Sequence, residues 1–120
     1  MRRILVTGSR TWTDEDEIRQ ALFAQRSWWG PAIVVHGACP WGADAIADRI
    51  APEIDLQVER HPAQWDLYGR SAGYLRNAHM VSLGADICLA FIHANSKGAT
   101  MCANLAEEAG ISTIRYRKER

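Results

Sequence analysis

Four short segments of the sequence combine glycine with side chains that suit an anionic ligand. In the first, residues 7–11, Gly8 permits a tight turn and a close approach of the backbone to a ligand. Ser9 offers a hydroxyl group there, and Arg10 offers a forked cationic donor that matches a phosphate. The same residues also fit an ordinary strand-to-helix turn with a surface arginine, so both interpretations stay open for this segment alone.

The second segment, residues 36–44, places Gly37 and Gly42 around a turn that leads into a helix. Backbone N–H groups at such a helix start can bind a phosphate. Trp41 can stack on a nucleobase or cover a pocket. Asp44 has two interpretations: it can accept a hydrogen bond from a ribose hydroxyl, or it can cap its own helix, which is the commoner role for such an aspartate.

The third and fourth segments add a second cationic group and another helix start. Arg76 and Asn77 lie in a helical stretch beside Gly73, and glycine weakens a helix interior unless something approaches it closely. The alternative is that Arg76 and Asn77 simply face solvent. Gly98 and Thr100 open the last helix in a phosphate-binding manner, although Thr100 can equally serve only as the N-cap. Neither of the established phosphate patterns, GxxxxGK[ST] or GxGxxG, occurs in the sequence.

The elements that must position these segments alternate between strands and helices. Apolar runs predict strands at residues 3–7, 32–36, 57–61, 86–92 and 111–116. Helical spacing predicts helices from a cap at 13 or 14 to the Gly30-Pro31 break, from 43 to a stop at Pro52, over 70–83 after a loop at 62–69, and over 101–109. This order predicts an α/β fold with a doubly wound, mostly parallel five-stranded sheet and helices on both faces. Ligands bind such sheets outside the carboxyl ends of the strands, and we expect all four segments to converge at that edge.

Composition narrows the class of protein further. A length of 120 residues fits one domain, and Lys plus Arg equals Asp plus Glu at 14 each, so no global field attracts nucleic acid or a membrane surface. No apolar run is long enough for a membrane helix. Three cysteines without a CxxC pair argue against a disulfide framework or a zinc site, and we expect a reducing, cytoplasmic location with no metal or cofactor.

Five stretches occur together and in order: residues 6–10, 35–38, 42–44, 73–80 and 98–100. With them, the chain resembles the YspA-like branch of the SLOG superfamily over residues 3 to 116. This superfamily includes the DNA-processing protein Smf/DprA and the Lonely Guy enzymes. The resemblance implies a Rossmann-like fold that binds a nucleotide or a nucleotide-derived ligand, with residues 1–120 forming a single nucleotide-binding domain.

The resemblance also implies what a reaction would need. Lonely Guy members hydrolyse cytokinin nucleoside monophosphates with an arginine in an RKxxM stretch and a glutamate in PGGxGTxxE. Arg76 and Met80 match the spacing of the first stretch, but Ala103 stands three residues after Thr100, where the glutamate would be. Cleavage of an N-glycosidic bond needs a carboxylate at the reacting centre. Binding, as a sensor of the ligand, is therefore favoured over catalysis.

Two other hypotheses remain. A hydrolase of nucleoside monophosphates would use Arg76 together with Asp44 or Glu107. A nucleic-acid-handling module, by similarity to Smf/DprA, is disfavoured because the charge is balanced and there is no basic stripe. We predict ligand binding by Gly8, Ser9, Arg10, Gly37, Ala38, Trp41, Gly42, Asp44, Arg76, Asn77, Gly98 and Thr100.

Tryptophan is unusually frequent, with five in the chain. Trp28, Trp29 and Trp65 exceed what so small a core can bury, so we expect an exposed apolar patch. Such a patch predicts self-association, most simply as a homodimer, which SLOG relatives often form.

Overall fold

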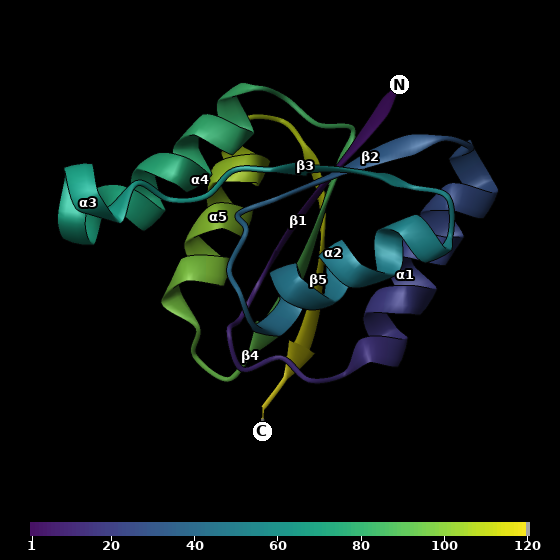
Figure 1. The fold of residues 1–120 in the computed structure, drawn as a ribbon, viewed down its shortest axis with the longest axis horizontal. Coiled ribbons are helices and arrows are strands. Elements are labelled where there is room, and N and C mark those ends of the chain that lie inside the picture. The colour runs from purple at the N-terminus through teal and green to yellow at the C-terminus, as the bar shows by residue number, and fades with distance from the viewer. Residues whose placement is uncertain (120) are drawn as a thin grey trace.

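Continuous apolar runs form the middle of a five-stranded sheet in which every neighbouring pair of strands is parallel (Figure 1). The computed structural model describes residues 1–119. The strands are β1 (Arg2–Gly8), β2 (Ala32–His36), β3 (Gln57–Arg60), β4 (Ile87–His93) and β5 (Ser112–Lys118). Their order in the sheet is β3-β2-β1-β4-β5. The weak, polar β3 lies at an edge, as its composition predicts, and β4 is buried along nearly its whole length.

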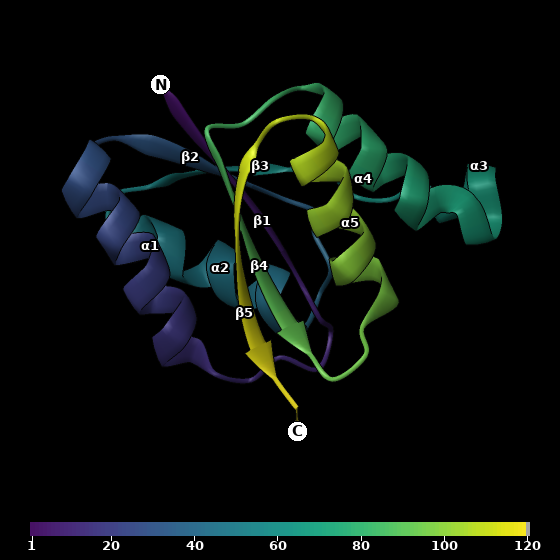
Figure 2. The same ribbon diagram turned by 180° about the vertical axis from the view of Figure 1, so that it is seen from behind.

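Helices cover both faces of this sheet (Figures 1 and 2). They are α1 (Glu15–Trp29), α2 (Gly42–Glu53), α3 (Trp65–Tyr68), α4 (Ala72–Ser82) and α5 (Lys97–Glu108). Because successive strand residues point to opposite faces, Ile4 and Val6 pack with α1 and α2, whereas Leu5 packs with α4 and α5. The predicted doubly wound α/β fold is confirmed, and it is Rossmann-like. No helix among residues 1–119 has the length and apolar character needed to cross a membrane.

Several boundaries differ from the expectation, and α5 begins at Lys97, four residues before the predicted start at 101. The stretch predicted as a loop at 62–69 contains the short helix α3, and a 3-10 turn at Gly69–Ser71 precedes α4, which begins only at Ala72. Gly69 has φ +55°, a conformation that ends α3 and changes the direction of the chain. The predicted stop at Pro52 is also early, because α2 continues to Glu53. The cap of α1 is Asp14, whose carboxylate accepts the N–H of Glu17 at 3.1 Å.

The chain reverses its winding direction at β1, whose neighbours β2 and β4 lead to helices on opposite faces. Loops leaving the two strands therefore diverge and leave a crevice between them. At the bottom of this crevice, Gly8 at the end of β1 packs closely against Ala43 of α2 and Phe91 of β4. A Cβ there would collide with the Cβ of Ala43 and would lie 2.8 Å from the carbonyl oxygen of Phe91. Only glycine lets α2 begin this near the end of β1.

Candidate functional site

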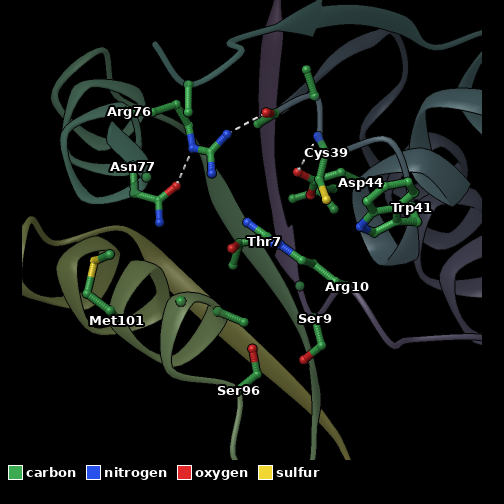
Figure 3. Close-up of a pocket in the computed structure, with 18 of the residues that line it drawn as sticks. Thr7, Ser9, Arg10, Cys39, Trp41, Asp44, Arg76, Asn77, Ser96 and Met101 are labelled. Atoms are coloured by element: carbon green, nitrogen blue, oxygen red, sulfur yellow. Dashed lines mark hydrogen bonds between the residues drawn. The ribbon is translucent and has the colours of Figure 1, made fainter. Parts of the chain in front are cut away.

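The loops that leave β1, β2 and β4 enclose an open pocket of about 1180 Å³ (Figure 3). Residues of α3, α4 and the amino end of α5 complete its wall. This volume lies slightly above the roughly 300–1,000 Å³ that is common for small-molecule sites. Every residue predicted to bind the ligand lines the pocket, with the exception of Gly42 and Thr100.

Arg76 projects from α4 toward the loop after β2 (Figure 3). Its Nη1 donates a hydrogen bond to the carbonyl oxygen of Gly37, and its Nε donates to Oδ1 of Asn77 at 2.7 Å. Asn77 is itself buried, so it holds the guanidinium in place. Among residues 1–119, Nη2 of Arg76 has no hydrogen-bond partner and Arg76 has no ion-pair partner. Part of this cation therefore remains available to a ligand.

Arg10 supplies a second cationic group from the loop after β1. It is exposed, and within the described part of the chain it makes neither a hydrogen bond nor an ion pair. Figure 3 shows its side chain extending into the pocket toward Thr7. Its guanidinium carbon lies 6.0 Å from the centroid of the Trp65 ring. Two arginines thus face one pocket, and neither is neutralised by a carboxylate in contact with it.

Asp44 is the single carboxylate among the described residues that line the pocket. The prediction that it caps its own helix is wrong. The N-cap of α2 is Trp41, which has no side-chain cap bond, whereas Asp44 Oδ2 accepts the N–H of Cys39 at 3.4 Å. Asp44 therefore braces the loop that precedes α2. Burial raises the pKa of this carboxyl, against the opposing effects of His36, the Cys39 N–H and Arg76.

The amino end of α5 provides unpaired backbone donors. Ser96 is the N-cap and makes no side-chain cap bond, while Gly98 and Ala99 in the first turn line the pocket. The first N–H groups of a helix have no partner within the helix and carry its positive dipole end. A Cβ at Gly98 would meet nothing within 4 Å, so space for a ligand lies beside this turn. These donors suit a phosphate group.

The two predicted residues outside the pocket have structural roles. Gly42 has φ +74°, and a Cβ there would collide with the carbonyl oxygen of Ser9 and with Arg10, so it lets two loops pack together. Thr100 is not the N-cap; its hydroxyl donates to the carbonyl oxygen of Ser96 at 2.7 Å. Ser9 lines the pocket, but its hydroxyl accepts the N–H of His93 at 2.8 Å and thereby joins the loops after β1 and β4.

His36 supports the pocket from behind. The imidazole is 1% exposed, and its Nδ1 accepts the N–H of Ala38 at 2.9 Å. Nε2 therefore carries the proton and donates to Asp48 at 2.8 Å, which in turn pairs with Arg60 at 2.7 Å. Both ring nitrogens of His36 at the end of β2 are therefore hydrogen-bonded within the fold. The imidazole holds Ala38 in a left-handed conformation with φ +58°.

Several lining residues were not predicted from the sequence. Trp65 and Tyr74 come from α3 and α4, and Thr11 contacts Nδ1 of His93 at 2.5 Å across the pocket mouth. Ala94 adopts a left-handed conformation with φ +54°, which is unusual for alanine and could not be predicted from the residue type. The high tryptophan content was the one available indication, and it pointed to exposure rather than to a pocket. Exposure itself is confirmed at Trp28, Trp29 and Trp65. No group of three or more potential metal ligands gathers within residues 1–119.

Fold and site together define a Rossmann-like domain with a cationic pocket at the point where the strand order reverses. The model of the YspA, cpYpsA-related SLOG family matches residues 2–68. A curated relative, Gene 61 protein of Mycobacterium phage D29, is 44% identical over 123 residues, which cover 97% of this chain and 97% of the relative. The chain belongs to the YspA, cpYpsA-related SLOG family. No solved structure matches it.

Proposed function

We propose that this domain binds a phosphate-bearing nucleotide or nucleotide-derived ligand at the carboxyl edge of its sheet and acts as a sensor of that ligand. The observation that carries the proposal is the pair Arg10 and Arg76, which face one pocket without a contacting carboxylate. Burying part of an unpaired cation costs free energy, and an anionic ligand offsets that cost. The donors at the start of α5 add a second favourable place for phosphate.

Hydrolysis of a nucleoside monophosphate is the second candidate function, and Asp44 is the observation that favours it. The other carboxylate considered, Glu107, pairs with Arg115 at 2.7 Å and is not among the residues that line the pocket. A buried carboxyl with a raised pKa can protonate a leaving base. Release of free base from AMP or CMP, abolished by Asp44→Asn, would establish this activity. Binding without release leaves the sensor as the better account.

Three further expectations remain proposals. The free thiols of Cys39, Cys88 and Cys102 fit a reducing cytoplasm. The exposed Trp28 and Trp29 on α1 fit a homodimer, which sedimentation velocity over a range of concentrations would test. A role in handling nucleic acid fits the balanced charge poorly, and salt-dependent binding of single-stranded DNA would revive it.

Native mass spectrometry of freshly purified protein tests the main proposal directly. We expect an added mass that corresponds to a nucleotide derivative, and its loss in Arg76→Ala. Arg19→Ala is the matched control, since Arg19 pairs only with Glu53 on the surface away from the pocket. A ligand at about 100 times its Kd should also stabilise the fold by about 2.7 kcal/mol. Absence of any bound mass, together with no thermal shift by AMP or ribose 5-phosphate, would reject the proposal.

A further inference from the structure

Three large aromatic side chains line the pocket while remaining at least half exposed. Trp41, Trp65 and Tyr74 are 61%, 50% and 53% exposed, and we call this group the aromatic rim. They come from three separate segments: the loop after β2, helix α3 and helix α4. Leaving indole and phenol rings in water forgoes the free energy of their burial. Because all three rings line one cavity, a molecule bound in that cavity would cover them.

The position of Trp65 leaves a ring face accessible. Its Cη2 rests against Gly73 of α4, where an added Cβ would make an ordinary 3.5 Å contact. On the pocket side, Arg10 stands 6.0 Å from the ring centroid, whereas Arg2 lies only 4.2 Å from the centroid of Trp29. The guanidinium of Arg10 is thus not seated on the ring. Helix α3 has no buried residue and projects from the body of the domain, so the ring can adjust to a ligand (Figures 1 and 2).

The pocket also contains polar groups that are buried, unlike the aromatic rim. Asp44 and Asn77 are buried at 7% and 6% exposure, and Asn77 Oδ1 accepts a hydrogen bond from Nε of Arg76. Pro40, Pro62 and Ala63, which precede Trp41 and Trp65 by one to three residues, also line the pocket, and their side chains offer no hydrogen bond. The pocket therefore combines buried polar side chains, which suit phosphate and ribose, with exposed aromatic rings, which suit a flat apolar ring.

We propose that the aromatic rim is a stacking subsite for the base of the nucleotide-derived ligand. The inference rests on the proposed function and extends it to the ligand's class. The base is recognised by its face rather than by its hydrogen-bonding edge, because the rim presents ring surfaces. The domain therefore accepts both purine and pyrimidine derivatives, with tighter binding of the larger purine ring.

The experiment compares ribose 5-phosphate, AMP and CMP by isothermal titration calorimetry on the full chain. We expect AMP and CMP each to bind about 5- to 100-fold more tightly than ribose 5-phosphate. Trp65→Ala should remove most of this advantage and leave the affinity for ribose 5-phosphate unchanged, while Trp65→Phe should keep most of it. Trp28→Ala, which changes an exposed tryptophan outside the pocket, is the control and should bind the three probes with wild-type affinity. Since α3 buries no residue, these variants should fold normally, which circular dichroism verifies.

The outcomes separate the two proposals. Equal affinity for all three probes, or unchanged AMP binding in both Trp65→Ala and Trp41→Ala, overturns the stacking subsite while the phosphate site stands. Strong binding of one base with rejection of the other also overturns it, because it requires recognition of the base edge. A change of oligomeric state in Trp65→Ala, with AMP binding intact, would assign the rim to a protein contact instead. Binding of none of the probes removes the proposed function and the subsite with it.

Discussion

The guanidinium of Arg76 lies against the backbone of Gly37, 39 residues earlier in the chain, and donates to its carbonyl oxygen. A Cβ at Gly37 would stand 2.6 Å from Cζ of Arg76 and 2.9 Å from its Nε. Because Gly37 has no side chain, the guanidinium of Arg76 can occupy this position. Bound in this way, the guanidinium needs little reorganisation to meet a phosphate, which lowers the entropic cost of binding.

Gly37→Ala should therefore move Arg76 without unfolding the domain. The colliding atoms belong to the end of a flexible side chain, so we expect a loss of stability of only about 1 kcal/mol. Affinity for AMP should fall about as far as in Arg76→Ala, because the held geometry is lost in both. Thermal melts and calorimetry measure the two effects separately. Wild-type affinity in Gly37→Ala would show that the ligand does not use Arg76 in this position.

Gly98→Ala probes the amino end of α5. The added methyl would meet nothing within 4 Å, and alanine is favoured over glycine inside a helix by up to about 1 kcal/mol. We expect a small rise in melting temperature together with weaker binding of AMP and ribose 5-phosphate, since the methyl stands beside the N–H groups of the first turn. A melting temperature and an affinity that both rise would exclude phosphate from this helix start.

Much of the fold could be predicted because local and global preferences agree. Continuous apolar runs such as Ile4–Val6 and Ile87–Ile92 demand burial on both faces, which a parallel sheet between helices provides. The short helix α3 was missed because its four residues bury nothing and so leave no periodic pattern.

The sequence predicted which loops form the site, but it did not predict the contacts between them. The residues of each loop can be identified because they follow the predicted end of a strand. Tertiary packing, by contrast, determines that Arg76 contacts Gly37 and that Asp44 accepts the N–H of Cys39. Gly42 was assigned to the ligand because glycine before a helix suits both phosphate binding and close packing, and the structure shows the packing contact.

Gly42→Ala should be far more damaging than a comparable change elsewhere. Its φ of +74° disfavours alanine, and the new Cβ would also collide with backbone atoms of Ser9 and Arg10, which cannot move aside cheaply. Gly110 is the matched control, with φ +82° and nothing within 4 Å of the added Cβ. We expect Gly110→Ala to lose about 1 kcal/mol of stability and Gly42→Ala to lose roughly 3 kcal/mol or more. Urea denaturation measures both, and equal losses would contradict the backbone collision.

Acid stability should depend measurably on Glu59. Two nitrogens of Arg3 donate to its carboxylate at 3.0 and 2.8 Å, and His61 contacts it at 2.7 Å. These hydrogen bonds from Arg3 and His61 lower the pKa of Glu59 to about 2. Because the folded-state pKa is depressed, the stabilisation is complete above the ordinary carboxyl range and is lost as the pH falls toward 2.

Glu59→Gln removes this titration while keeping the shape of the side chain. Wild type should lose free energy of unfolding as the pH falls from about 5 to 2, and the variant should lose less over the same window. Asp14 and Asp48, whose pKa values are also lowered, still titrate in both proteins, so some acid dependence remains. Urea denaturation at intervals across this window supplies the comparison. Parallel curves for the two proteins would mean that the Arg3–Glu59–His61 contacts do not stabilise the fold. A carboxyl whose pKa is the same in the folded and unfolded states adds no pH dependence to the free energy of unfolding.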